Sequence, residues 1–386
     1  MNLNTIELED RHASGGVGRR PFVIVRAEGV RLWDEAGHEY LDCSAAHGWA
    51  NVGHSHPLVT RAIQEQAARL VAWTESSYNE QRALWMRDLA AVTPGDLNRI
   101  HPCNSGTEAI EGAIKAARFF TKRPRIIAAQ RAFHGRTFAA LTATWNKDYR
   151  EPFEPLLPGF SHVPYNDLAA MDEAIDDQTA AVLLEVVQGE GGVYPGDPDY
   201  FAGVRRLCDE RGALLIFDEI QTGFGRTGKM FAAEYLSILP DIMALGKGLG
   251  GGIPMGATVW SDRLGTLASG THSSTFGGNP LACAASRAVL QVMHEEGLPA
   301  RAAHLGAWLI GELRAIPSPQ VREVRGLGLM IGVQLRGRVT PLLKALAEAG
   351  IWALPAGPTV LRLLPPLVIS EADLETVVEK LKRALS

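Results

Sequence analysis

The stretch Ala180-Ala-Val-Leu-Leu-Glu-Val-Val187 decides the fold class, because it is a near-continuous apolar run. Such a run is typical of a parallel strand that is buried on both faces. A helical pattern over residues 198–211 follows it, and then a second apolar run, Ala213-Leu-Leu-Ile-Phe217. Strands that alternate with helices in this way indicate an α/β fold with a mostly parallel sheet.

The same alternation extends outward from this stretch. A helical pattern from about 106 to 120 precedes a short strand at Arg125-Ile-Ile-Ala-Ala129. Towards the C-terminus we predict one helix over about 280–315, a strand pair around Gly328–Leu335 and Val360–Leu364, and a last helix.

The length of 386 residues is enough for two domains. We predict a large domain over residues 51–285. The N-terminal segment 1–50 is expected to join residues 286–386 in a smaller domain.

Composition is that of an ordinary globular protein, with 46% hydrophobic and 21% charged residues. A net charge of −5 gives no general attraction for nucleic acid or an anionic membrane. The first thirty residues lack the apolar segment of a signal peptide, and no run approaches about 18 apolar residues. Four cysteines without metal-type spacing indicate a reducing compartment: Cys43, Cys103, Cys208 and Cys283. We therefore expect a cytoplasmic protein without a metal site.

Lys247 and Asp218 point most directly to a chemistry. Lys247 is enclosed by glycines in Asp241-Ile-Met-Ala-Leu-Gly-Lys-Gly-Leu-Gly-Gly-Gly252, where it can approach a flat ligand without crowding. Asp218 closes the apolar run Leu214-Leu-Ile-Phe and can face the same cavity. Pyridoxal phosphate chemistry requires this pair: an amine for a Schiff base, and a carboxylate that keeps the ring nitrogen protonated.

Two hydroxyls and a glycine open the helix predicted from residue 106, in Ser105-Gly106-Thr107-Glu108. Helix N-termini have unpaired N–H groups and a positive dipole end, so they bind phosphate well. Taken alone, the segment favours an ordinary capping box between Ser105 and Glu108. The lysine and aspartate downstream make phosphate binding the better interpretation.

Glycine patterns at 223–228 and 246–251 match nucleotide-binding motifs but do not support them. Met230 stands where a P-loop needs Ser or Thr, and the segment Gly250–Pro254 cannot open the helix that a Rossmann turn requires.

Two other pairs of polar residues receive structural interpretations. His54 and His56 lack companion ligands nearby in sequence, so a turn before Pro57 is favoured over a metal site. Asp218 and Glu219 are neighbours on a strand and would point to opposite faces, so they would not share one reacting atom.

With these residues in place, the chain resembles the class III, fold-type I, pyridoxal phosphate-dependent aminotransferases. The resemblance runs from Gly53-His-Ser-His-Pro57 to Leu363-Leu-Pro-Pro-Leu367. It implies a mostly parallel seven-stranded sheet flanked by helices, plus a smaller α+β domain. Within the class, the chain is most similar to the acetylornithine transaminase branch. It is closest there to the transaminase that serves lysine biosynthesis on the amino-group carrier protein LysW, a likeness carried by residues 149–153, 315–319, 321–326 and 356–360.

The resemblance also implies roles for the residues that hold the cofactor. Lys247 would form the Schiff base and then move a proton, Asp218 would pair with the pyridine nitrogen, and Gln221 would bind the ring hydroxyl. Phe133 would stack on the ring through its flat apolar face. The phosphate would be bound by Ser105, Gly106 and Thr107. Thr275 would reach the phosphate of a neighbouring subunit, which implies an isologous homodimer.

Three charged residues concern the substrate. Arg362 is the single charge in Thr359-Val-Leu-Arg-Leu-Leu-Pro-Pro-Leu367, where the alternative is an edge-strand arginine that snorkels to solvent. The resemblance makes it the fork that grips the α-carboxylate of glutamate and 2-oxoglutarate. Glu190 would pair with Arg362 while an ω-amine donor is bound and release it for glutamate. Arg136 would grip the distal carboxylate of the donor, the alternative being a surface-loop arginine.

Two positions depart from the family pattern. Val186 stands where many relatives have proline, and His47 stands where close relatives have a tyrosine near the substrate entrance.

The resemblance therefore implies an ω-aminotransferase. It would move the terminal amine of N-acetylornithine or of LysW-bound lysine to 2-oxoglutarate, giving a semialdehyde and glutamate in arginine or lysine biosynthesis. An ornithine or 4-aminobutyrate aminotransferase, or glutamate-semialdehyde aminomutase, is the alternative. Arg362 and Glu190 argue against the aminomutase, which need not bind free glutamate.

Overall fold

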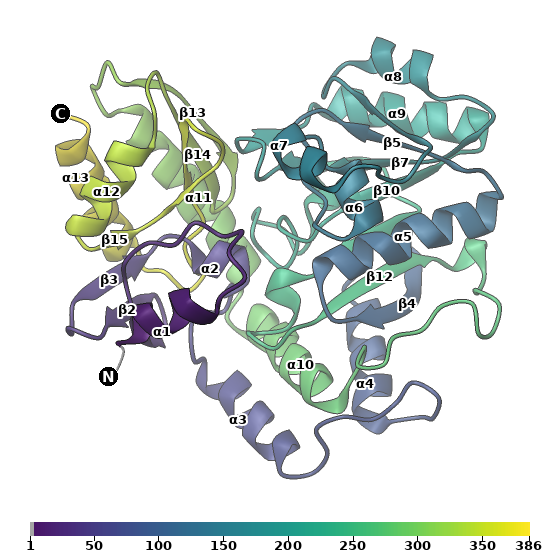
Figure 1. Ribbon diagram of the computed structural model, residues 1–386, viewed down its shortest axis with the longest axis horizontal. Coiled ribbons are helices and arrows are strands. Elements are labelled where there is room, and N and C mark those ends of the chain that lie inside the picture. Colours follow the sequence, from purple (N-terminus) through teal and green to yellow (C-terminus); the bar gives the residue numbers. More distant parts are fainter. Residues whose placement is uncertain (1–3) are drawn as a thin grey trace.

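The computed structural model describes residues 4–386. The first and last parts of the chain, purple and yellow, lie together on the left of Figure 1, and the middle of the chain forms the larger part on the right. The larger part is built on one seven-stranded sheet. Its strands, in spatial order, are β4 (Leu97–Cys103), β12 (Gly256–Ser261), β11 (Ile242–Leu245), β10 (Leu214–Asp218), β7 (Thr179–Glu185), β5 (Arg125–Ala129) and β6 (Phe160–Val163).

The sheet is mostly parallel, as predicted. The strands from β11 to β6 pair in parallel, and β12 alone runs antiparallel to both of its neighbours. All residues of β7, β10, β11 and β12 are buried. This burial on both faces explains the near-continuous apolar runs in the sequence.

Helices cover both faces of this sheet. Leu215 and Phe217 of β10 belong to the core that includes α9 (Pro198–Arg211), whereas Leu214 and Ile216 belong to the core that includes α5 (Gly106–Thr121). Side chains alternate between the faces of a strand, so one apolar run serves both cores. The remaining helices of this part are α3 (Pro57–Ala67), α4 (Glu80–Ala90), α6 (Phe138–Ala143), α7 (Lys147–Arg150), α8 (Leu168–Ala174) and α10 (Pro280–Glu295), with short 3₁₀ turns at Glu151–Phe153, Ala232–Tyr235 and Asp262–Leu264.

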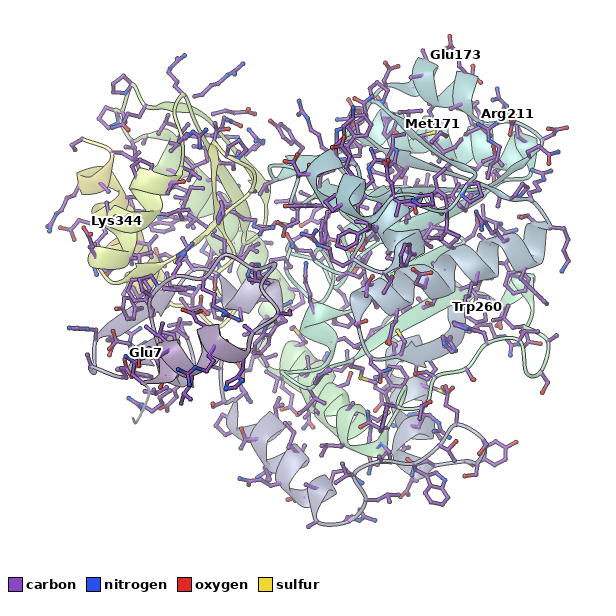
Figure 2. The ribbon with its side chains drawn as sticks, in the orientation of Figure 1. Glu7, Met171, Glu173, Arg211, Trp260 and Lys344 are labelled. Atoms are coloured by element: carbon purple, nitrogen blue, oxygen red, sulfur yellow. The ribbon has the colours of Figure 1, made fainter. Side chains whose placement is uncertain are left out.

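Side chains at the rim of this part show the same division between core and solvent. On α8, Met171 is completely buried, whereas Glu173 points outward (Figure 2). Trp260 of β12 packs in the core that includes α5, and its indole N–H donates to the Gly265 carbonyl at 2.9 Å.

The smaller part combines the two ends of the chain. In its first sheet, β1 (Ile24–Glu28), β2 (Arg31–Asp34) and β3 (Glu39–Asp42) are joined by β15 (Ile351–Trp352), which pairs in parallel with β3. A second sheet has the order β13 (Val321–Leu327), β14 (Met330–Leu335), β17 (Val360–Leu363), β16 (Leu354–Pro355). The helices here are α1 (Thr5–His12), α2 (Ala45–Gly48), α11 (Leu298–Arg314), α12 (Thr340–Glu348) and α13 (Glu371–Ala384). The division of the chain at residues 50 and 285 stays a prediction.

Two details of the predicted elements are wrong, and one strand was not predicted. The helix expected over 280–315 is two helices, α10 and α11, because Gly297 adopts a left-handed conformation (φ 58°) and Pro299 lies in the first turn of α11. The strand expected over 180–187 ends at Glu185, since Val187 belongs to β8 (Val187–Gln188), which forms a separate ribbon with β9 (Tyr194–Pro195). The predicted strand pair is confirmed as β14 and β17, which run antiparallel, but β13, on the other side of β14, was not expected.

Two further expectations concern membranes and cysteines. Across residues 4–386, none of the helices has the length and apolar character needed to cross a membrane. All four cysteines are buried free thiols.

Candidate active site

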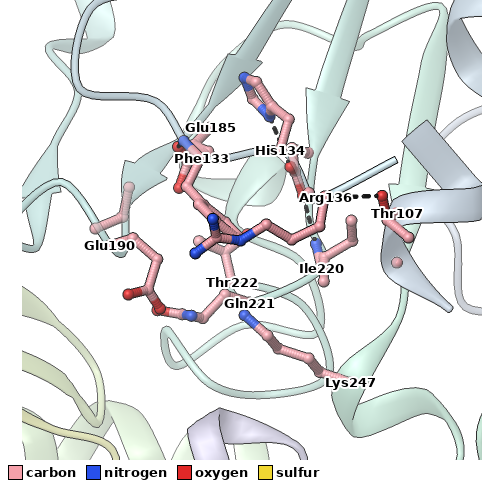
Figure 3. A pocket seen from close by; sticks show the side chains of 14 residues that line it. Thr107, Phe133, His134, Arg136, Glu185, Glu190, Ile220, Gln221, Thr222 and Lys247 are labelled. Atoms are coloured by element: carbon pink, nitrogen blue, oxygen red, sulfur yellow. Dashed lines mark hydrogen bonds and ion pairs between the residues drawn. The ribbon is translucent and has the colours of Figure 1, made fainter. Parts of the chain in front are cut away.

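A cavity of about 250 Å³ lies at the carboxyl ends of the central strands (Figure 3). In open α/β sheets this is where ligands bind. The lining comes from the first turn of α5 and from the ends or following loops of β5, β7, β10 and β11. Its residues include Gly106, Thr107, Phe133, His134, Arg136, Glu185, Glu190, Asp218, Gln221 and Lys247.

Lys247 lies in a strained turn directly after β11. Its φ of 45° is in the left-handed region, which is rare for residues other than glycine and is often found at functional sites. The flanking glycines are required sterically: a Cβ at Gly248 would lie 2.6 Å from Nδ2 of Asn51, and one at Gly246 would lie 3.1 Å from the Cα of Gly106. The turn therefore brings the lysine and the start of α5 into one small space.

Desolvation lowers the pKa of the Lys247 amine, against the opposing charges of Glu190 and Asp218. A lower pKa increases the fraction of neutral amine, which is the form that attacks a carbonyl carbon.

Asp218 is held firmly at the end of β10. Its Oδ1 accepts a hydrogen bond from the Ile220 N–H at 3.0 Å, and its Oδ2 lies 2.8 Å from Nδ1 of His134 (Figure 3). Both side chains are buried. Nε2 of His134 is also buried and has no hydrogen-bond partner among residues 4–386. These contacts fix a carboxylate facing the cavity.

The start of α5 has the features of a phosphate site. Ser105 caps the helix by accepting from the Glu108 N–H at 3.3 Å. Glu108, however, accepts from the Asn104 N–H at 2.5 Å rather than from Ser105, so the expected capping box is only half formed. Gly106 and Thr107 line the cavity, while Ser105 lines an adjoining space with Gly106 and Lys247. The helix N-terminus thus opens beside the lysine.

Arg362, on β17, contacts two residues that line the cavity. Its Nη1 lies 2.5 Å from Oε1 of Glu190 and 3.2 Å from Oε1 of Gln221. The side chain is 1% exposed and β17 lies between β14 and β16, so the alternative of a snorkelling edge-strand arginine is wrong. Its Nε has no partner within the described part of the chain. A buried guanidinium with an unpaired N–H group can donate a hydrogen bond to the carboxylate of a ligand.

Glu190, on the loop after β8, forms an ion pair with the Arg362 guanidinium. Burial raises the pKa of its carboxyl, but the charges of Arg362 and Lys247 outweigh that effect and lower it overall. The carboxylate is therefore ionised near neutral pH. About a third of the side chain (32%) stays exposed.

Phe133 and Arg136 lie on the loop between β5 and α6. The Arg136 guanidinium stacks 3.7 Å from the centre of the Tyr149 ring and lies 5.4 Å from that of Phe133. Although the residue as a whole is exposed, Arg136 lines the cavity, which fits a substrate role better than that of a plain surface-loop arginine.

Thr275 is not brought to the cavity within this chain. It is exposed, on the loop between β12 and α10, and does not belong to the lining residues. Its contact with a neighbouring subunit stays a prediction.

The sequence interpretation missed His134 and Glu185 as lining residues. His134 follows Phe133 directly, and Glu185 is the single charge in the apolar run of residues 180–187, a signal that could have identified it. Glu219, next to Asp218, turns away as expected and accepts from the Ala232 and Ala233 N–H groups at 3.1 and 2.7 Å.

The two histidines of the turn before α3 bind different partners. His54 contacts Asp42 at 2.7 Å, and His56 contacts Glu296 at 3.0 Å. Within residues 4–386, no group of three or more His, Cys, Asp or Glu side chains is placed to hold a metal ion.

The fold and this site define a pyridoxal phosphate-dependent transferase of fold type I. The model of the family described as aminotransferase class-III matches residues 13–385. The chain belongs to the class III aminotransferases, enzymes of the EC 2.6.1 group that use pyridoxal 5'-phosphate.

Two similar curated proteins carry different substrate names. The [LysW]-aminoadipate semialdehyde transaminase of Deinococcus radiodurans is 45% identical over 382 residues, covering 98% of this chain and 89% of that protein. The acetylornithine aminotransferase of Methanopyrus kandleri is 46% identical over 386 residues, covering 99% of each chain.

Solved structures agree on the fold. Ornithine aminotransferase from Toxoplasma gondii, with partial occupancy of pyridoxal phosphate at its active site, has a TM-score of 0.94 at 34% identity, covering 98% of this chain and 93% of that chain. Acetylornithine aminotransferase from Elizabethkingia anophelis has a TM-score of 0.89 at 35% identity, covering 98% of each chain.

The residues present fit the cofactor. A lysine amine of lowered pKa, a buried carboxylate and a helix N-terminus surround one cavity, and each matches one part of pyridoxal phosphate: its aldehyde, its ring nitrogen and its phosphate.

Proposed function

We propose that this aminotransferase moves the terminal amine of an N-blocked ornithine or lysine to 2-oxoglutarate, giving a semialdehyde and glutamate. The single observation that carries the proposal is the ion pair, at 2.5 Å, between the buried Arg362 and Glu190, which lines the same cavity as Lys247. One site must accept both a cationic ω-amine end and the carboxylate of glutamate. A paired arginine that can be released meets both needs.

Bound pyridoxal phosphate supplies an electron sink for the chemistry at the substrate carbon. Lys247 supplies the amine that anchors the cofactor and then carries a proton to and from the reacting carbon. Asp218, oriented by Ile220 and His134, keeps the ring nitrogen protonated, because a fixed carboxylate stabilises the positive charge there.

Other residues orient the cofactor in this proposal. Phe133 and Gln221 line the cavity, where Phe133 would pack on the ring and Gln221 would donate to the ring hydroxyl. The phosphate is bound by Ser105, Gly106 and Thr107, where the helix dipole and free N–H groups of α5 favour an anion.

Arg362 and Glu190 allow one site to bind two different substrates in turn. While the ω-amine donor is bound, Glu190 neutralises Arg362, so that no unpaired buried cation faces the donor's ammonium group. When glutamate enters, its α-carboxylate replaces Glu190, which can turn towards solvent because its side chain is already a third exposed. Arg362 then makes two parallel hydrogen bonds to that carboxylate.

Arg136 is proposed to hold the carboxylate at the far end of the donor. Its guanidinium is oriented by the Tyr149 ring, which reduces the freedom lost on binding. A blocked α-amine suits this chemistry, because a free one would cyclise with the semialdehyde product.

The blocking group is either acetyl or the carrier protein LysW, and we propose that both forms are accepted. Similar proteins named for each substrate support this dual competence. Arg19, Arg20 and Arg26 are candidates for a basic rim that meets an acidic carrier. Arg19 and Arg26 already form ion pairs with Glu9, Asp10 and Glu28, which makes them weaker candidates. Arg20 donates to the Ala353 carbonyl, and its guanidinium lies 4.7 Å from the centre of the Trp352 ring.

A homodimer with shared sites is part of the proposal. The loops around Glu75 and Ser274 lie side by side, joined by a hydrogen bond of 2.9 Å. The first loop carries the exposed aromatic side chains Trp73 and Tyr78, and the second carries the exposed Phe276 directly after Thr275. Apolar groups gathered on the surface are typical of an interface.

Steady-state kinetics decide the substrate. Activity with acetylornithine and with carrier-bound lysine is compared with activity on ornithine and 4-aminobutyrate, each at low and high salt. We expect both blocked donors to be preferred, and the carrier-bound donor alone to lose affinity with salt, since exposed opposite charges are screened. Preference for unblocked ornithine or 4-aminobutyrate would contradict the proposal.

A further inference from the structure

A second carboxylate, that of Glu185, lies beside Asp218 in the cavity. Glu185 ends β7 and Asp218 ends β10, and the two residues are direct partners in the parallel pairing of these strands. Both are buried, with 6% and 5% of each residue exposed, and both line the cavity. Two carboxylates placed so closely in a buried site are unfavourable unless other groups stabilise them.

The contacts of Glu185 join two loops. Its Oε1 accepts from the Phe133 N–H at 3.0 Å, and its Oε2 accepts from the Gly189 N–H at 2.9 Å. The first loop carries Phe133 and Arg136, and the second carries Glu190. One side chain thus connects the loop beside the cofactor ring with the loop that carries the partner of Arg362, and Figure 3 shows Glu185 next to Phe133 and His134.

The ionised form is the one that suits these contacts. A carboxylate presents both oxygens as acceptors, whereas a protonated acid must turn one of them into a donor. An N–H group faces each oxygen of Glu185, so protonation would weaken one of the two contacts, because a hydroxyl oxygen without a negative charge is a poorer acceptor.

The charges around Glu185 set its proton affinity. Burial raises the pKa of its carboxyl to about 7, with His134 opposing this rise and Asp218 adding to it. Lys247 and Tyr165 also face it, the latter donating its hydroxyl to the Glu185 carbonyl at 2.7 Å. A positive charge on a cofactor ring nitrogen beside Asp218 would favour the ionised form.

We propose that Glu185 is a positioning residue for transamination: while ionised, it clamps the Phe133 loop and the Gly189–Glu190 loop in one arrangement around the cofactor. The inference rests on the roles proposed above for Phe133 and Glu190. It predicts that the clamp weakens as the pH falls below about 7, because Glu185 then takes up a proton.

The test compares Glu185→Gln with a matched control, Glu219→Gln, in the full-length holoenzyme. Glu219 is also buried, also accepts two backbone N–H groups, and burial likewise raises its pKa to about 7, but it faces away from the cavity. Any effect of merely removing a buried carboxylate is therefore shared by both variants.

For Glu185→Gln we expect kcat/KM in the glutamate half-reaction to fall about 10- to 100-fold, the loss expected for one charge-assisted hydrogen bond. The acid limb of its pH profile, present in the unmodified enzyme at or below about pH 7, should disappear. The circular dichroism of the bound cofactor should change, since Phe133 shifts against the ring. Glu219→Gln should keep both the acid limb and the spectrum.

Equal losses in both half-reactions, with an unchanged pH profile and spectrum, would reduce Glu185 to a structural residue and overturn the inference. If Glu185→Gln does not fold, Glu185→Asp replaces it: the shorter side chain cannot reach both loops, so kcat/KM must fall and the acid limb must be lost, as expected for Glu185→Gln. If the enzyme does not use glutamate, the proposed function fails. The pH dependence of the cofactor's circular dichroism then tests the clamp without any substrate, and identical curves for Glu185→Gln and the unmodified enzyme would overturn it.

Discussion

Replacing Arg362 with alanine tests the proposed sorting of substrates most directly. The guanidinium is 1% exposed and contacts Glu190 and Gln221 through Nη1, with its Nε unpaired among the described residues. In the proposed complex it makes two parallel hydrogen bonds to the α-carboxylate of glutamate.

The expected magnitude follows from these contacts. Each charge-assisted hydrogen bond contributes about 1.5–3 kcal/mol, so losing the pair amounts to about 3–6 kcal/mol. This corresponds to a decrease of roughly 10²- to 10⁴-fold in kcat/KM for glutamate, since every 1.36 kcal/mol is a factor of ten. The ω-amine half-reaction should change by less than about tenfold, because there Arg362 only neutralises Glu190, whose partly exposed carboxylate can be solvated instead.

Single-turnover absorbance of the cofactor measures each half-reaction separately. Glutamate is mixed with the pyridoxal form of the enzyme in one experiment and acetylornithine in the other. Arg362→Lys is the companion variant: it keeps the charge but lacks the planar fork, and should fall between alanine and the unmodified enzyme. Equal losses in both half-reactions would refute the role, because they would show that Arg362 supports the structure of the site and does not bind the glutamate carboxylate in particular.

Four further predictions follow from the same geometry. Lys247→Ala should still bind pyridoxal phosphate but fail to turn over, and borohydride reduction of the unmodified enzyme should place the cofactor label on Lys247; a label elsewhere would contradict this. Asp218→Asn should decrease the rate by orders of magnitude in both half-reactions, since a neutral amide cannot stabilise the protonated ring nitrogen; near-normal kcat would exclude that role. Glu190→Gln should shift preference towards glutamate, because Arg362 is then free; an unchanged ratio of the two kcat/KM values would remove the switch. Arg136→Ala should raise KM for acetylornithine strongly with a smaller effect on glutamate, and equal KM changes would argue against a distal-carboxylate role.

Some features were predictable because they depend on local sequence. Strands β7 and β10 appear as apolar runs since both faces are buried, and Lys247 is marked by glycines that its turn requires sterically. Other features depend on contacts between distant residues. The hydrogen bond from His134 to Asp218 and the two bonds of Glu185 are set by packing across strands. The contact of Arg362 with Glu190 is also long-range, and it was expected only from the resemblance to the family. The break at Gly297 was missed although the sequence marks it: the polar residues His294-Glu-Glu296 interrupt the apolar pattern, and Gly297 and Pro299 are typical of a helix end and a helix start.

The parallel pairing of β15 with β3 has a consequence for how the protein is made. Leu41 pairs with Ile351, so the first sheet cannot be completed until almost the whole chain has been synthesised. Until then β3 keeps an open edge, a template for pairing with the wrong strand. Contacts so distant in sequence also slow folding, because a very long loop must close before they form. The central sheet, whose strands all lie between residues 97 and 261, can form earlier, which leaves the two chain ends to assemble last.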